Sequence, residues 1–166
     1  MNKITGMQTR ELKIFVCEYG SIEELPEADR QLIYSARDAA QKAYAPYSHF
    51  YVGAALLLAN GEVICGNNQE NAAFPAGLCA ERVVLFYAHA RYPDVAVKSL
   101  AVTAIKNQIL TNDPVKPCGS CRQALIESEF RFKQPIRIIS DGKERIEVFE
   151  GAENLLPYPF KPGLQG

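Results

Sequence analysis

Three cysteines in two short stretches constrain this chain more than any other feature. Cys79 begins the stretch Cys-Ala-Glu-Arg, and Cys118 and Cys121 belong to the stretch Pro-Cys-Gly-Ser-Cys-Arg-Gln. If a helix begins at Pro117, a spacing of three residues puts both of these sulfurs on one face of its first turn. Proline suits that position, because its φ is already helical and its missing N–H would have no partner there. Cys79 follows a helix-resistant Pro-Ala-Gly segment, so a second helix is predicted to begin there. Two helix starts could therefore converge on one cation.

Three thiols that meet at helix N-termini are typical of a zinc site with one open position. The positive end of a helix favours thiolate over thiol, and catalytic zinc takes three protein ligands and leaves the fourth position to water. Zinc with three thiolates keeps a net charge of −1, for which Arg82 and Arg122 are the natural compensators. Thiolates also weaken zinc as a Lewis acid, so the bound water needs a base. Glu81, two residues after Cys79, is placed to accept that proton.

Two other interpretations of the cysteines stay open at this point. A Cys-x-x-Cys pair alone is also typical of a thioredoxin-like redox protein or of half a structural zinc site. No fourth Cys and no His stands at ligand spacing. Cys17 and Cys65 lie in strand-like surroundings and are predicted to be buried apolar residues. His49 and His89 are predicted to be surface or packing residues.

Six segments in order resemble the zinc-dependent cytidine deaminases of the three-cysteine, homotetrameric type. The resemblance extends from about residue 36 to residue 160, and it implies a three-layer α-β-α fold with a central five-stranded mixed sheet. The segments that carry it are Ala45-Pro46-Tyr47-Ser48-His49-Phe50, Val52-Gly53-Ala54-Ala55-Leu56, Asn68-Gln69-Glu70-Asn71-Ala72, Cys79-Ala80-Glu81-Arg82, Pro117-Cys118-Gly119-Ser120-Cys121-Arg122-Gln123 and Leu155-Leu156-Pro157.

The resemblance implies hydrolysis of cytidine and 2'-deoxycytidine to the uridine nucleosides and ammonia, in pyrimidine salvage. One zinc per subunit is held by Cys79, Cys118 and Cys121 and activates a water molecule. Glu81 takes the proton of that water, delivers it to ring nitrogen 3 and then passes a second proton to the departing amine. The nearest rival enzyme is a deaminase of a modified aminopyrimidine nucleoside such as blasticidin S. The sequence does not predict the preference between ribose and deoxyribose.

The resemblance also assigns the residues around the substrate. The substrate-binding residues that it implies are Phe50 against the pyrimidine, Asn68 and Glu70 on the ribose hydroxyls, Ala80, and Phe160 from a neighbouring subunit of a homotetramer with shared active sites. Arg82 is expected to hold the thiolates by charge-assisted hydrogen bonds. Two positions depart from the family pattern, because Phe74 replaces a common Tyr and Lys116 replaces a frequent Ser.

The composition narrows the class of partner. The chain has 166 residues, of which 48% are hydrophobic, so it is predicted to form one globular domain. The resemblance implies a catalytic domain at 27–166, preceded by an N-terminal extension at 1–26. Eighteen basic and nineteen acidic residues give a formal charge of −1, which argues against a nucleic-acid substrate. No apolar run reaches about 18 residues, so neither a membrane partner nor a secretion signal is predicted. A cytoplasmic protein with reduced thiols is expected.

The spacing of apolar residues predicts alternating helices and strands. Helices separate the strands at 62–67, 100–105 and 136–140, which indicates parallel neighbours, whereas Asp141-Gly142 predicts an antiparallel return. The helix that starts at Cys79 is apolar nearly all round and is expected to be buried. A strand at 12–19 is expected to pair with a sheet edge or with a neighbouring subunit. Helices are predicted at 27–44, 79–91 and 118–129, and strands at 51–59, 62–67, 100–105, 136–140 and 145–149.

Overall fold

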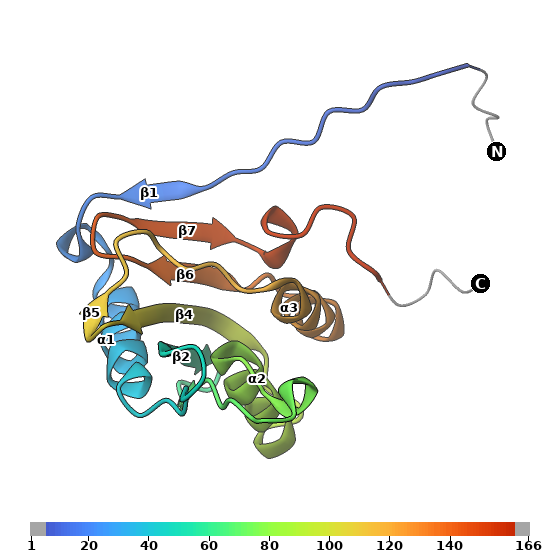
Figure 1. Ribbon diagram of the computed structural model, residues 1–166. Helices are drawn as coiled ribbons and strands as arrows, with labels where there is room; N and C mark the ends of the chain where they lie inside the picture. The colour runs from blue at the N-terminus through green and yellow to red at the C-terminus, as the bar shows by residue number, and fades with distance from the viewer. Residues whose placement is uncertain (1–5, 162–166) are drawn as a thin grey trace.

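The computed structural model describes residues 6–161 as a mixed β-sheet with helices on both faces (Figure 1). The strand order is β1-β7-β6-β4-β2-β3, and β5 pairs with β4 outside this path. The α-helices in this described part of the chain are α1 Glu27–Ala40, α2 Ala80–Arg91 and α3 Gly119–Phe132. The strands are β1 Cys17–Tyr19, β2 Phe50–Leu58, β3 Val63–Asn67, β4 Val97–Lys106, β5 Ile109–Leu110, β6 Arg137–Asp141 and β7 Ile146–Glu150.

The two faces of the sheet bury alternate residues of the same strands. On β2, Leu56 packs in the core under α2 and α3, while its neighbour Ala55 packs under α1. Ile138 and Ile139 on β6 divide between the two cores in the same way. Because successive strand side chains point to opposite faces, nearly continuous apolar strands are required when helices cover both sides. The three-layer arrangement therefore follows from the apolar runs in the sequence.

The predicted directions of β4, β6 and β7 are confirmed, but β3 and β4 are not the parallel neighbours predicted, because β2 lies between them and pairs antiparallel with both. The predicted number of strands is also wrong. β4 and β6 are parallel and are joined through α3, while β7 returns antiparallel to β6 after a tight turn. Within residues 6–161 the sheet has seven strands rather than five. β5 is a two-residue pairing that follows Asn107 and Gln108, both of positive φ, and it is too short to leave a periodic signal. β1 adds the seventh strand, because Cys17–Tyr19 pairs with the edge strand β7.

Several predicted boundaries and burials need correction. The strand predicted at 12–19 is limited to Cys17–Tyr19, since only these residues reach β7. Cys17 and Cys65 are exposed rather than buried, because each lies on a strand near a sheet edge, where one side is uncovered. The helix α2 is not covered all round, since Phe86 and Tyr87 are about half exposed. Residues 1–5 of the predicted N-terminal extension and residues 162–166 of the predicted catalytic domain lie outside the described residues. Among the described helices, none is long and apolar enough to cross a bilayer.

Gly53 marks the closest approach between α1 and the sheet. A Cβ at this position would lie 2.0 Å from the carbonyl oxygen of Ala36 and 2.4 Å from the backbone nitrogen of Ala40. Both contacts are with backbone, so the helix would have to move away from the strand. We expect Gly53→Ala to lower the free energy of unfolding by about 1–3 kcal/mol, measured by urea denaturation.

Gly119→Ala is the matched control for this substitution. Gly119 begins α3, and a Cβ there would meet nothing within 4 Å, so the change should be neutral or stabilising. Equal unfolding midpoints for the two variants would show that α1 does not limit the space at Gly53.

Candidate metal centre and substrate cavity

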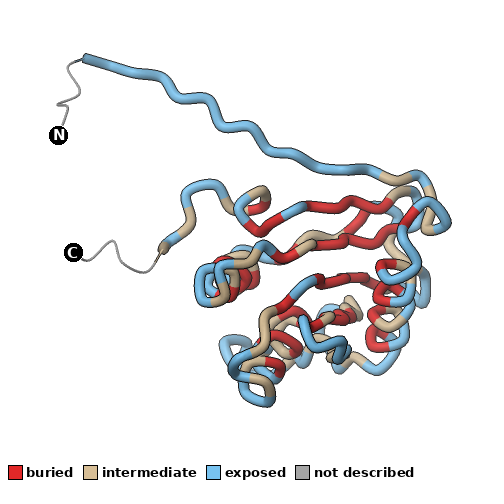
Figure 2. The backbone as a smooth tube through the Cα atoms, turned by 180° about the vertical axis from the view of Figure 1, so that it is seen from behind, coloured by how far each residue is buried: buried red, intermediate tan, exposed pale blue. Residues whose placement is uncertain are grey.

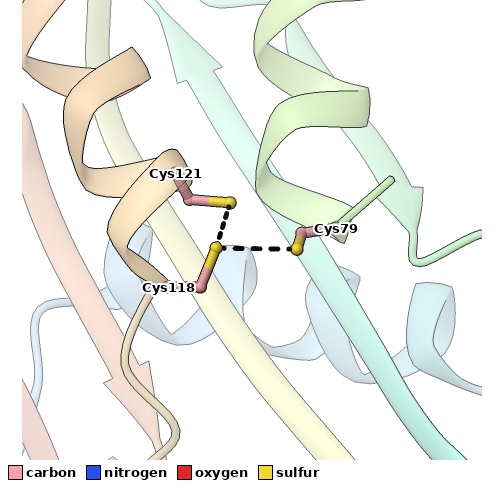
Figure 3. Close-up of side chains that lie close together, drawn as sticks. All are labelled: Cys79, Cys118 and Cys121. Carbon is pink, nitrogen blue, oxygen red and sulfur yellow. Dashed lines mark hydrogen bonds between the residues drawn. The ribbon is translucent and has the colours of Figure 1, made fainter. Parts of the chain in front are cut away.

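The N-termini of α2 and α3 bring the three predicted thiols together (Figure 3). Cys79 is the N-cap of α2, Cys118 is the N-cap of α3, and Cys121 lies in the first turn of α3. The Cys79 and Cys118 sulfurs are 3.7 Å apart, and those of Cys118 and Cys121 are 3.4 Å apart. The helix α3 starts at Gly119, one residue later than the predicted range 118–129, because Cys118 keeps an extended backbone and caps the helix. The predicted convergence of two helix starts is confirmed.

The spacing of these sulfurs fits a tetrahedral zinc site. With Zn–S bonds of about 2.3 Å, two tetrahedral thiolate ligands lie about 3.8 Å apart. The sulfurs here all lie within 4.8 Å of one another, and they form the potential metal-binding group found among residues 6–161. Three soft sulfur donors favour zinc over calcium or magnesium, which prefer oxygen ligands. The residues present therefore fit zinc, with one coordination position left for a non-protein ligand.

The pKa values of two of the thiols are shifted in opposite directions, and the lowered one favours the thiolate form that binds a cation. A hydrogen bond from Cys121, reinforced by Arg82, lowers the pKa of Cys79 to about 5, and the same bond raises the pKa of Cys121. The Nη2 atom of Arg82 lies 3.9 Å from the Cys79 sulfur. Arg122, which was also predicted to compensate the thiolates, forms no hydrogen bond with them among the described residues. It donates instead to the carbonyl oxygens of Pro117 and Leu155, each at 2.7 Å, and so ties the start of α3 to the C-terminal segment.

Glu81 lies beside the thiols with its carboxyl group almost removed from water. It is only 5% exposed and lines the same cavity as Cys79 and Cys118. Burial raises the pKa of Glu81, and the negative charge of Cys79 raises it further. A carboxyl group with a raised pKa gains and loses a proton more readily near neutral pH, as a general acid and base must.

A cavity of about 680 Å³ opens over the thiols and Glu81. It lies between the turn after α1, the end of β3 and the loop before α3, and its volume suits a nucleoside-sized ligand. Of the predicted site residues, six line it: Phe50, Asn68, Glu70, Cys79, Glu81 and Cys118. Cys121 and Ala80 are fully buried behind the cavity wall, and Arg82 lies behind the sulfurs. Phe160 is 67% exposed and is held by Gln123 on α3, outside this cavity.

Asn68 and Glu70 are held in place by the chain around them. The Asn68 side chain accepts a hydrogen bond from the Val52 N–H at 2.8 Å and donates to the Phe50 carbonyl at 3.0 Å. Glu70 accepts hydrogen bonds from the hydroxyl of Ser48 and from the backbone N–H of Tyr47, and these hydrogen bonds lower its pKa. Glu70 is therefore a carboxylate at neutral pH, fixed at the rim of the cavity.

Sequence reasoning gave no role to several residues that line the cavity. Tyr47 and Ser48 belong to a segment that carries the family resemblance, and this was the available signal for them. Phe74 is 76% exposed and meets Tyr47 edge to face, with ring centroids 6.0 Å apart. The hydroxyl that the family pattern would place at Phe74 is thus replaced by an apolar wall.

Lys116, the second departure from the family pattern, forms an ion pair beneath the loop that leads to Cys118. Its Nζ lies 2.8 Å from Glu147 on β7, whose side chain is only 7% exposed. We expect Lys116→Met to lower the free energy of unfolding by about 1–3 kcal/mol, because a nearly buried carboxylate loses one of its two cationic partners. Arg145, at 3.1 Å, remains as the other.

Lys42→Met provides the comparison for Lys116→Met. Lys42 pairs with Asp38 one helical turn away, and both side chains are about two thirds exposed, so its loss should cost about 0.5 kcal/mol or less. Equal unfolding free energies for the two variants would contradict a stabilising role for Lys116.

The family model for the cytidine and deoxycytidylate deaminase zinc-binding region matches residues 26–134. A cytidine deaminase of Halalkalibacterium halodurans is 47% identical over 102 residues, which are 60% of this chain and 71% of that protein. A cytidine deaminase of Mycobacterium tuberculosis is 36% identical over 117 residues, 68% of this chain and 84% of that protein. The crystal structure of cytidine deaminase from Burkholderia pseudomallei superposes with a TM-score of 0.69 at 36% identity, covering 82% of this chain and all of that chain.

The chain therefore belongs to the cytidine and deoxycytidylate deaminase family: it is a zinc-dependent hydrolytic deaminase, and Zn²⁺ is its cofactor. This assignment decides against the redox and purely structural interpretations of the cysteine pair. It agrees with the observation that the three thiols border a cavity that also holds a buried carboxyl group.

Proposed function

We propose that the protein deaminates cytidine and 2'-deoxycytidine to uridine and 2'-deoxyuridine, with release of ammonia, as a step in pyrimidine salvage. The observation that carries the proposal is the position of Glu81, which lies buried beside three clustered thiols at the inner wall of a nucleoside-sized cavity. The relatives named as cytidine deaminases support cytidine as the substrate. The salvage role and a cytoplasmic location are expectations that rest on this substrate class.

The proposal assigns the zinc to Cys79, Cys118 and Cys121, one ion per subunit. Bound zinc supplies a Lewis acid that activates water at neutral pH. Glu81 accepts a proton from the water, transfers it to ring nitrogen 3 and then protonates the departing amine, so its carboxyl group acts as base and acid in turn. Burial raises the pKa of Glu81, which favours its protonated form between the two transfers. Arg82, 3.9 Å from the Cys79 sulfur, stabilises the thiolate charge.

The nucleoside is proposed to bind with its base inward and its sugar at the rim. Phe50 offers an aromatic face to the pyrimidine. The first backbone N–H groups of α2, including that of Ala80, have no hydrogen-bond partner within the helix. Asn68 and Glu70 stand where the ribose hydroxyls would lie. The Glu70 carboxylate favours a neutral sugar over a sugar phosphate, because a second negative charge at the rim would be repelled.

We also propose a homotetramer in which active sites are shared. Phe160 is exposed and lies outside its own cavity, so it is free to contact a neighbouring subunit. Phe86 and Tyr87 on α2 add exposed aromatic surface that a subunit contact would cover.

A substrate panel tests the proposal. Purified zinc-loaded protein is given cytidine, 2'-deoxycytidine, cytosine, cytidine 5'-phosphate and blasticidin S, and the loss of each aminopyrimidine is followed by ultraviolet absorbance. We expect kcat/KM for both nucleosides to exceed that for cytosine and for the phosphate by on the order of 100-fold or more, since sugar contacts that go unused leave polar groups unpaired. Faster turnover of blasticidin S than of cytidine would replace the proposed substrate with a modified aminopyrimidine nucleoside.

A further inference from the structure

Residues 6–16, the N-terminal arm, project from the sheet as an exposed extended segment. Figure 1 shows the arm in line with β1, extending from the N-terminal end of this strand away from the body, and Figure 2 shows it exposed along its length. The arm displays apolar side chains, with Leu12 53%, Ile14 54% and Val16 43% exposed. The match to the family model begins only at residue 26, so the arm lies outside the matched region. Its exposed apolar surface is therefore a feature that catalysis in the subunit itself does not explain.

The backbone of the arm has one free edge. The Phe15 N–H donates to Asn154 at 3.2 Å, on the same side as the pairing of Cys17–Tyr19 with β7. Because backbone groups of successive strand residues point to opposite edges, those of residues 10, 12, 14, 16 and 18 point to the other side. Among the described strands, β1 pairs only with β7. An extended apolar strand with such an edge readily pairs with another strand.

The residues on this free edge are complementary to themselves. Read in order, positions 10, 12, 14, 16 and 18 are Arg, Leu, Ile, Val and Glu. In an antiparallel pair centred on Ile14, Arg10 of each copy faces Glu18 of the other, and Leu12 faces Val16. The two Ile14 side chains meet at the centre. All five pairs on this face are then either apolar against apolar or opposite in charge, and such cross-strand pairs stabilise a sheet.

We propose that two copies of this chain associate through their N-terminal arms, which pair antiparallel about Ile14 and join the sheets of the two subunits. The alternative registers that keep the same edges together are less favourable. A shift of two residues places Arg10 opposite Val16 in one direction and Leu12 opposite Glu18 in the other. A shift of one residue does not keep these edges together, because it sets a residue whose backbone groups point to the partner opposite one whose groups point away. Within its own subunit, the Glu18 carboxylate lies 3.7 Å from Nε of Arg145. The Glu18 side chain is nevertheless 59% exposed, so it remains accessible to a partner's Arg10.

Charge exchange tests the register in the full-length zinc-loaded protein. Arg10→Glu sets two carboxylates opposite each other, and Glu18→Arg sets two guanidinium groups opposite each other, at both ends of the ribbon. Each single variant is expected to weaken self-association by about tenfold in sedimentation velocity, because like charges directly opposite destabilise the pair. The double variant restores opposite charges and is expected to return to within about twofold of the unchanged protein. The unchanged protein, the two single variants and the double variant share any association through the body of the subunit. Identical self-association of these four proteins would therefore overturn the proposal.

Cysteine crosslinking locates the centre of the pair. Ile14→Cys places two thiols directly opposite, where Cβ atoms of paired residues lie about 4.5–5.5 Å apart. Mild oxidation is expected to join this variant into covalent dimers. Leu12→Cys alone should give few dimers, but a mixture of Leu12→Cys and Val16→Cys proteins should crosslink to each other. The unchanged protein measures the background from Cys17, whose two copies would be about 20 Å apart in this register. Equal dimer yields for Ile14→Cys and Leu12→Cys would contradict the proposed pairing.

Discussion

Replacing Glu81 with Gln is expected to reduce deaminase turnover by on the order of 10²–10⁴-fold while the protein keeps its zinc. The carboxyl group is buried at the cavity wall, so water cannot easily substitute for it as a proton carrier. The amide has the same shape but cannot accept and release a proton. The fall should therefore appear mainly in kcat, with KM changed much less, in steady-state assays with cytidine.

Glu62→Gln is the matched control for this prediction. Glu62 lies on the exposed turn between β2 and β3, far along the chain from the thiols, and makes no contribution to the cavity. Its variant should retain full turnover. A Glu81→Gln protein that contains zinc and turns over at a near-normal rate would rule out Glu81 as the proton carrier.

Replacing Cys121 with Ser is expected to weaken zinc binding by about 100-fold or more, because altering a group that only supports a ligand already costs 10–100-fold. Cys121 is completely buried and lies 3.4 Å from the Cys118 sulfur, so no water-exposed donor can replace it without rearrangement of α3. Zinc retained after dialysis against a competing chelator measures the effect. Deaminase activity should be lost together with the metal.

Cys65→Ser separates the loss of this ligand from a general effect of removing a thiol. Cys65 is exposed on β3, away from the three clustered thiols, and its variant should keep one zinc per subunit. If Cys121→Ser retains zinc as well as Cys65→Ser does, Cys121 is not a ligand.

The sequence alone predicted the centre of the site more accurately than its surroundings. The spacing of Cys118 and Cys121, together with the predicted helix start at Cys79, was sufficient to predict three converging thiols, because helix geometry fixes where such side chains point. It did not predict the direction of Arg122. That guanidinium binds carbonyl groups of Pro117 and Leu155, and Leu155 lies 33 residues away in the chain.

Exposure at the sheet edges was the least predictable feature of the fold. Cys65 on the edge strand β3 stands in an apolar run, yet it is exposed, since apolar periodicity does not reveal where the covering helices end. Phe86 on α2 is exposed for a related reason, because its apolar run does not reveal which side of the helix the rest of the chain covers. β1 pairs through only three residues, and whether such a short segment joins the sheet depends on the edge that β7 leaves open. The ion pair between Lys116 and Glu147 was also hidden, because its partners are 31 residues apart.

The most direct measurement is product analysis after cytidine is mixed with purified zinc-loaded protein and, separately, with its Glu81→Gln variant. We expect the unchanged protein to convert cytidine to uridine with one ammonia released for each uridine, and the variant to form almost none although it holds zinc. A folded, zinc-containing protein that leaves cytidine unchanged would contradict cytidine as the substrate. Equal uridine formation by both proteins would contradict the role of Glu81.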